Sequence, residues 1–200
     1  MITYYPKPLA KLVNKLSGFP GVGQKSAQRM AFYIMSLPME EARDLCDSIM
    51  DVKQNIKECR ICHNFSSEEV CEICSAHDRK QNQICVVAEV KDIISMEKTN
   101  EYHGLYHVLG GVIDPFNKKG PENLNIKDLV QRVAGGNIEE VIIAVNPTVE
   151  GDTTALYIAG LLKNFVQKIT RIGYGLPVGA DMDYTDQATM IKAFQARNEI

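Results

Sequence analysis

The chain has 200 residues, an apolar fraction of 45% and a formal net charge of −3. This length suits one large domain or two small ones, and the composition is that of a globular protein with a hydrophobic core. The sequence lacks an uninterrupted apolar run of about 18 residues and the apolar core of a signal peptide, which argues against a membrane protein. We therefore expect a soluble, cytoplasmic protein with no membrane contact.

The basic residues are unevenly placed along the chain. Residues 1–35 hold five of them and no acidic residue, so the charge of +5 here leaves −8 for the rest of the chain. The five are Lys7, Lys11, Lys15, Lys25 and Arg29. Such an asymmetry indicates an anionic partner for the N-terminal end only.

Three helices are predicted before residue 57. Pro8 suits a first helical turn, and apolar residues follow it at helical spacing up to Leu16. A second helix is expected over 24–37. Pro38 then starts a third helix, whose apolar residues at helical spacing form a stripe that leads into the next segment. The stripe contains Ala42, Leu45, Cys46, Ile49, Val52 and Ile56.

The turn between the first two helices has the glycine spacing of a phosphate-binding P-loop, from Gly18 to Gly23. A P-loop, however, follows a strand and has a lysine directly after its second glycine. Here the turn follows a helix, and Gln24 precedes Lys25. These two departures argue against nucleotide binding at this position.

The same turn fits a helix-hairpin-helix motif. Gly21 and Gly23 allow the backbone to approach a phosphate, which the free N–H groups at the start of the second helix can bind. Lys25 and Arg29 lie four residues apart and project from one face of that helix. Contacts of this kind hold phosphates without reading bases. The alternative is a plain helical hairpin with solvated lysines, but the absence of acids favours a DNA-binding motif.

Four cysteines form two C-x-x-C pairs that are separated by eight residues. They are Cys59, Cys62, Cys71 and Cys74. Two such pairs supply the four thiolates of a tetrahedral zinc site, which leaves no open position for catalysis. The connector is too polar to build a core, so a structural Zn²⁺ would provide about 10 kcal/mol or more of its folding free energy. An alternative ligand set replaces one cysteine by His63 or His77.

Two further cysteines lie outside these pairs. Cys46 falls on the apolar face of the third predicted helix, and Cys85 lies within a predicted strand. Both are interpreted as small core residues. A chain without disulfides suits a reducing cytoplasm.

The chain after residue 80 alternates apolar runs with helical patterns. Strands are predicted over 84–90, 105–109, 141–145 and 168–172, with helices over 90–98, 125–135 and 152–165 between them. The second of these helices is expected to have Asn125 as its N-terminal cap. This order predicts an α/β fold with a parallel sheet and helices on both faces. Sites in such sheets lie beyond the carboxyl ends of the strands.

Polar residues at those ends are similar to the metal site of Toprim domains, which occur in topoisomerases and primases. Glu89 follows the first strand, and Glu150 follows a later one. Asn146 and Thr148 occupy positions where Toprim enzymes have aspartates, and neither is a good Mg²⁺ ligand. Asp152 could compensate only in part. We therefore predict a non-catalytic protein, with a metal-dependent Toprim nuclease or primase as the alternative.

The C-terminal stretch begins with a loop rich in glycine and proline, residues 173–184. Its Asp181 and Asp183 could hold a cation, but exposed loop acids usually hold none, so both are interpreted as ordinary exposed acids. A final helix is predicted to end near Arg197, with Ala188, Ile191 and Phe194 facing inward. We expect this arm to pack on a neighbouring subunit.

Four motifs in this order resemble the RecR family of bacterial recombination mediator proteins. They are the segment 19–29, the four-cysteine segment, the run 146–155 and the run 175–181. Asp152 stands where we would expect a glutamate, which is a small departure. The resemblance extends over nearly the whole chain.

This resemblance implies a non-catalytic scaffold of recombinational DNA repair. It would act with RecO and RecF to load recombinase on single-stranded DNA, as a homo-oligomer that ranges from a dimer to a tetrameric ring. Gly21, Gly23, Lys25 and Arg29 would contact DNA, and the acidic residues of the Toprim-like edge, Glu89, Glu150 and Asp152, would contact partners.

The expected domain organisation has four parts. They are a helix-hairpin-helix region over 1–57, a C4 zinc finger over 58–77, a Toprim domain over 82–175, and a C-terminal loop and helix over 176–200.

Overall fold

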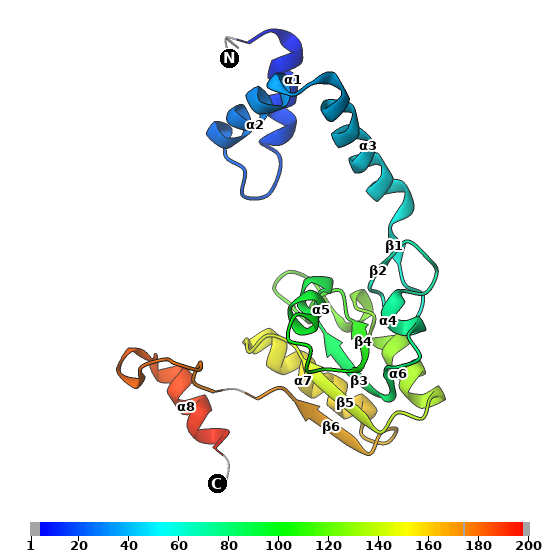
Figure 1. The fold of residues 1–200 in the computed structure, drawn as a ribbon. Helices are drawn as coiled ribbons and strands as arrows, with labels where there is room; N and C mark the ends of the chain where they lie inside the picture. The colour runs from blue at the N-terminus through cyan, green and yellow to red at the C-terminus, as the bar shows by residue number, and fades with distance from the viewer. Residues whose placement is uncertain (1–4, 174, 198–200) are drawn as a thin grey trace. The chain divides into compact units, whose positions relative to one another are not determined.

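The computed structural model describes residues 5–173 and 175–197. The chain divides into two compact units, Met1–Ile56 and Lys57–Ile200, which are described separately. Figure 1 labels the helices and strands of both units.

The first unit consists of three helices, α1 (Lys7–Leu16), α2 (Gln24–Ser36) and α3 (Met39–Asn55). Helices α1 and α2 form a hairpin whose small core is centred on Val13, Ala27 and Ala31. The two alanines are fully buried because the helices approach closely at their short side chains. All three helices agree with the sequence prediction.

Helix α3 buries none of its residues. The stripe predicted from its sequence is present, but it faces solvent: Leu45 is 41%, Ile49 55% and Val52 57% exposed. Cys46 is exposed as well, so its interpretation as a core residue is wrong. The helical periodicity identified an apolar face, but none of the described residues of the unit covers it.

The second unit begins with a short antiparallel pair, β1 (Lys57–Glu58) and β2 (Phe65–Ser66), followed by α4 (Glu72–Ser75). A four-stranded parallel sheet comes next, in the order β4-β3-β5-β6. Its strands are β3 (Lys80–Val87), β4 (Gly104–Val108), β5 (Glu140–Ala144) and β6 (Lys168–Arg171). The predicted parallel α/β sheet is confirmed.

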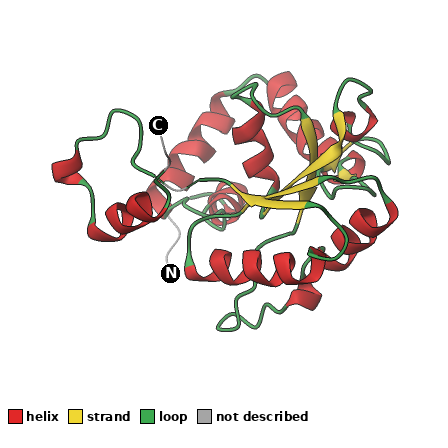
Figure 2. Ribbon diagram, turned by 90° about the horizontal axis from the view of Figure 1, so that it is seen from below, coloured by secondary structure: helices red, strands yellow, loops and turns green. Residues whose placement is uncertain are grey.

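Helices cover both faces of this sheet (Figure 2). Side chains of β3 alternate between the faces, because successive residues of a strand point to opposite sides. Ile84 and Val86 belong to the core under α6 (Ile126–Gly135) and α7 (Val149–Leu162). Cys85 and Val87 belong to the core under α5 (Val90–Glu97), as predicted for Cys85.

Two helix starts differ from the prediction. Helix α7 begins at Val149, three residues earlier than expected, because the Thr148 hydroxyl accepts the N–H of Gly151 at 3.1 Å and caps it. Asn125 precedes α6, but its side chain does not cap the helix. It donates instead to the Val108 carbonyl at 3.1 Å and so ties the helix start to β4.

The chain ends with a loop, the short 3₁₀ turn η2 (Met182–Tyr184) and α8 (Gln187–Gln195). The prediction that α8 buries an inward face is wrong, because no α8 residue is buried and Ile191 and Phe194 are 51% and 64% exposed. The 3₁₀ turn η1 (Pro121–Asn123) precedes α6.

Candidate functional site

The four paired cysteines converge on one point. Their sulfur atoms all lie within 4.8 Å of one another, and no other cluster among the described residues has three or more groups that could hold a metal ion. Cys59 and Cys62 come from the turn after β1, and Cys71 and Cys74 from the start of α4. The turn is closed by the Cys59 N–H, which donates to the Asn64 carbonyl at 2.7 Å.

The geometry and chemistry of the cluster suit zinc. The Cys62 and Cys71 sulfurs are 3.5 Å apart, close to the roughly 3.8 Å between sulfurs in a tetrahedral Zn–thiolate site. The Cys71 N–H donates to the Cys59 sulfur at 3.3 Å, as expected of a thiolate acceptor. The contact between the Cys62 and Cys71 thiols raises the pKa of Cys62 and lowers that of Cys71. A divalent cation is what allows all four to be thiolates together.

Neither histidine belongs to this ligand set. The His63 ring lies 3.2 Å from the Glu58 carboxylate through Nδ1 and 3.1 Å from the Asp128 carboxylate through Nε2. Both ring nitrogens are therefore engaged. His77 lies outside the cluster. With four protein ligands the site is a structural zinc site, as the cysteine spacing predicted.

The zinc segment is anchored to the sheet. The Val108 N–H at the end of β4 donates to the Cys62 carbonyl at 2.8 Å. The His63 ring meets the edge of the His107 ring at a centroid distance of 5.4 Å. Burial lowers the pKa of His107 to about 4, so this ring is neutral and its Nε2–H donates to the Asn125 carbonyl at 2.8 Å. These contacts hold the zinc turn against β4, the strand at the edge of the sheet.

The first unit presents a basic surface at the start of α2. Gly21 has a φ of +76°, a conformation that favours glycine, and it makes the tight turn. Helix α2 follows without a side-chain cap and without an acid in its first turn, so its first N–H groups can bind an anion. Lys25 and Arg29 are exposed on this helix, and neither makes a hydrogen bond or ion pair with another described residue.

Helix α1 carries a second row of cations. Lys7, Lys11 and Lys15 are exposed and lie four residues apart, which places them along one face of the helix. The sequence prediction included them only as part of the net charge, although their spacing already indicated a common face. These lysines add positive charge to the hairpin beyond the predicted contacts.

Glu89 and Asn146 lie at the same carboxyl edge of the sheet, since Val87 pairs with Ala144 at the ends of β3 and β5 and each residue follows two positions later. The Glu89 carboxylate pairs with the Lys91 ammonium at 2.6 Å, and the Glu89 N–H donates to the Asp92 carboxylate at 2.8 Å. Glu89 therefore forms the start of α5. Glu150 lies half-buried in the first turn of α7.

Asp152 is committed to contacts within the chain. Its carboxylate accepts from the Arg171 guanidinium at 2.7 Å and lies 3.5 Å from the Lys192 ammonium of α8. These two cations compete with any metal or external partner for the same oxygens. The sequence prediction missed this, because Arg171 and Lys192 carry no motif.

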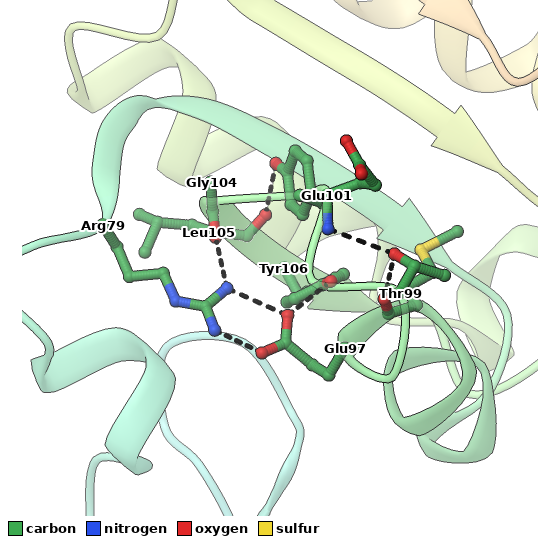
Figure 3. A network of polar contacts seen from close by, with 9 residues as sticks. Arg79, Glu97, Thr99, Glu101, Gly104, Leu105 and Tyr106 are labelled. Carbon is green, nitrogen blue, oxygen red and sulfur yellow. Dashed lines mark hydrogen bonds and ion pairs between the residues drawn. The ribbon is translucent and has the colours of Figure 1, made fainter.

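A polar network fixes the start of the sheet to α5 (Figure 3). The Arg79 guanidinium forms an ion pair with Glu97 through two N–H groups and donates to the Gly104 carbonyl at 3.2 Å. The Tyr106 hydroxyl donates to the same Glu97 carboxylate at 2.7 Å. The hydrogen bonds between Arg79 and Glu97 lower the pKa of Glu97 and raise the pKa of Arg79. This network secures the chain where it leaves the zinc segment.

Replacing Glu97 with glutamine should reduce the free energy of unfolding by about 2 kcal/mol at neutral pH, since charged hydrogen bonds to Arg79 and Tyr106 become neutral ones. Because the pKa of Glu97 is lowered in the folded state, its contribution is present above the unfolded pKa of about 4.3 and is lost as the pH falls through the folded value. Urea unfolding followed by circular dichroism at pH 7 and in acid measures both effects. The exposed Glu101→Gln variant is the matched control, and equal losses in the two variants would contradict the role of the network.

The helical hairpin, the four-cysteine site and the parallel sheet define a class of protein. It is a zinc-containing Toprim protein with a helix-hairpin-helix unit. Models of known families match the same segments. The matches are the RecR helix-hairpin-helix over residues 9–53, the RecR zinc finger domain with four cysteines over 56–76, the Toprim domain over 82–173 and the RecR C-terminal segment over 175–198.

Similar proteins share the full length of the chain. The recombination protein RecR of Moorella thermoacetica is 48% identical over 98% of this chain and 99% of its own. That of a Cyanothece species is 46% identical over the whole of both chains. The chain belongs to the RecR family, which confirms the resemblance drawn from its motifs. None of the helices within residues 5–173 and 175–197 has the length and apolar character that a membrane span requires.

Proposed function

We propose that this protein is a non-catalytic DNA-binding scaffold of recombinational DNA repair in the bacterial cytoplasm. It acts with RecO and RecF to load recombinase on single-stranded DNA. The proposal includes the four domains predicted from the sequence, over residues 1–57, 58–77, 82–175 and 176–200. The observation that carries it is the basic hairpin, in which exposed Lys25 and Arg29 stand beside the uncapped start of α2. Phosphate contacts of this kind bind DNA without sequence preference.

The residues at the positions of the Toprim metal ligands support the absence of catalysis. Asn146 and Thr148 offer no charged oxygen, and the Thr148 hydroxyl is occupied as the cap of α7. Glu89 pairs with Lys91, and Asp152 is held by two cations. A two-metal phosphoryl-transfer site needs several free carboxylates around one point. Incubation with DNA and Mg²⁺ or Mn²⁺ tests this, and nicking or primer synthesis that Glu89→Gln abolishes would overturn it.

The edge that carries these acids is the proposed partner surface for RecO and RecF. Glu89 and Glu150 are the residues we assign to it as direct contacts. Asp152 contributes through its pairing with Lys192, which links the C-terminal arm to this edge. A partner with basic side chains would have to compete with Lys192 for the Asp152 carboxylate.

The exposed stripe of α3 supports self-association. A 17-residue helix with no buried residue leaves an apolar surface in water, and such surfaces mark interaction sites. A second copy of the same chain, placed through its own stripe, gives the isologous contact that symmetric homo-oligomers use. The exposed apolar residues of the C-terminal arm offer a second contact, so that dimers can close into a ring.

The Lys25→Ala/Arg29→Ala double variant should bind single-stranded and duplex DNA more weakly, and by a similar factor for different sequences, because each side chain contacts phosphate. The slope of log affinity against log salt concentration should fall by about two. Fluorescence anisotropy with labelled oligonucleotides over a series of salt concentrations measures this. The Lys127→Ala/Lys163→Ala variant removes the same charge from the sheet unit and serves as control. An unchanged slope in the Lys25/Arg29 variant would argue against the hairpin as the contact.

A further inference from the structure

A loop after β4 displays an aromatic side chain that is almost fully in solvent. Phe116 is 95% exposed. It lies at the tip of residues 110–120, which we call the Phe116 loop. Two backbone hydrogen bonds between Asp114 and Lys119 close the loop below its tip. The Asp114 N–H donates to the Lys119 carbonyl at 2.8 Å, and the Lys119 N–H donates to the Asp114 carbonyl at 2.9 Å. Phe116 is therefore held outward by an ordered turn.

Polar contacts inside the turn fix its shape without using the ring. The Asp114 carboxylate accepts from the Asn117 N–H at 3.2 Å and from the Asn117 amide at 2.6 Å, and these bonds lower the pKa of Asp114. The Lys119 ammonium crosses Gly111 and donates to the Gly110 carbonyl at 2.7 Å. The Asp114 carboxylate is therefore engaged within the turn, and the Lys119 side chain stabilises the base of the loop.

Lys118 is arranged differently from Lys119. Its φ of +55° places it in the left-handed region, which a lysine rarely adopts. Its ammonium makes no hydrogen bond or ion pair with any residue in the described part of the chain. The turn therefore presents an available cation two residues after an exposed ring. The next acid along the chain is Glu122, whose carboxylate lies against Gly120 at the base of the loop.

The base of the loop is anchored at the carboxyl edge of the sheet. The Leu109 N–H donates to the Val87 carbonyl at 2.9 Å, at the end of β3. The Ile113 N–H donates to the buried Thr154 hydroxyl of α7 at 2.9 Å. These bonds connect the loop to β3 and α7, whose ends lie at the carboxyl edge of the sheet. The position of Phe116 relative to that edge is therefore fixed.

We propose that the Phe116 loop is a contact for single-stranded nucleic acid, in which an unpaired base stacks on the Phe116 ring and the Lys118 ammonium binds the adjoining phosphate. Proteins that bind single strands without sequence preference combine an aromatic face with nearby cations. A protein partner would account for the exposed ring, since phenylalanine is enriched in protein interface cores, but not for the cation beside it, because lysine is depleted there. This contact rests on the proposed DNA-scaffold function and adds a strand preference that the basic hairpin does not supply.

The chain contains no tryptophan, which makes stacking directly measurable. The Phe116→Trp variant introduces the single tryptophan of the chain at the tip of the loop. Titration with oligo(dT) should quench its emission strongly, because a stacked base quenches an indole. Duplex DNA of equal length should quench it much less, since its bases are already stacked. The Leu156→Trp variant replaces a residue that is 75% exposed on α7, and its emission should respond to neither.

Affinity gives a second, independent measure. Phe116→Ala should weaken binding of oligo(dT) by about ten-fold or more, and binding of duplex DNA by little. Lys118→Gly removes the ammonium and keeps the turn, because glycine accepts the positive φ without strain. It should lower the salt slope for oligo(dT) by about one. Phe116→Tyr keeps the aromatic face and should bind as the parent chain does.

The outcomes separate this proposal from the scaffold function. If labelled oligo(dT) binds the Phe116→Trp protein but the indole is not quenched, the loop proposal is overturned while the scaffold function stands. If oligo(dT) fails to bind even at low ionic strength, both fail. An indole that responds to purified RecO alone and not to oligo(dT) would assign the loop to a protein contact and overturn the proposal.

Discussion

Replacing Cys71 with serine is expected to abolish zinc binding and to unfold residues 57–77 while the sheet stays folded. The buried core of this segment consists only of Cys59, Cys62 and Cys71. Three sulfur-bearing residues cannot repay the conformational entropy of about twenty residues. The metal must supply that free energy, which amounts to roughly 10–16 kcal/mol for structural Zn²⁺ sites near neutral pH.

The effect on the sheet should be smaller but measurable. The zinc turn contributes the Cys62 carbonyl to the Val108 N–H and the His63 ring to the Asp128 carboxylate. Loss of the turn leaves these groups to water. It also exposes the buried His107 ring that packs against His63. We expect a fall in the free energy of unfolding of the sheet of about 1–3 kcal/mol.

Three measurements check this prediction. Metal analysis should find one zinc per chain in the parent protein and none in Cys71→Ser. Hydrogen exchange should show rapid exchange over 57–77 and protection of β3 and β5. Cys46→Ser removes a thiol that is exposed on α3 and should keep its zinc. A Cys71→Ser protein with a full complement of zinc and unchanged exchange would contradict the four-cysteine site.

The elements that were predicted well from the sequence are those whose signal is local. The cysteine pairs specified their own cluster, since a tetrahedral site fixes both ligand type and spacing. The apolar run from Ile84 to Val87 predicted a buried strand, and the structure divides these residues between two cores. Gly21 was identified as part of a tight turn, and it has the positive φ that such a turn needs.

The features that were missed depend on distant partners. Asn125 precedes a helix, as a cap does, but its side-chain oxygen accepts no helix N–H, and its NH2 group donates to the Val108 carbonyl at the end of β4. Asp152 resembled a free acid until the fold placed Arg171 beside it. Cys46 lies on an apolar stripe, and a pattern alone does not say whether the stripe is covered within the same chain. Tertiary contacts decide each case.

The uncovered stripe of α3 is the surface through which copies of the chain are proposed to associate. Replacing Ile49 with glutamate should dissociate the proposed oligomer without unfolding the chain. Ile49 is 55% exposed at the middle of the stripe, so a charge there costs the single chain little. In a contact between two copies the charge would be buried against the apolar stripe of the other copy, and an unpaired buried charge is strongly unfavourable. Light scattering should show a lower mass, and circular dichroism should be unchanged.

DNA binding should fall with the mass. A single chain has one basic hairpin, and several hairpins on one assembly bind the same polymer with an avidity gain of about 10²–10⁴. The Ile49→Glu variant should lose affinity on that order for long DNA and much less for an oligonucleotide that reaches only one hairpin. Gln54→Glu adds the same charge to the polar side of α3 and should change neither mass nor affinity. If Ile49→Glu keeps the parent mass, the α3 stripe is not the contact, and the exposed residues of α8 become the surface to test.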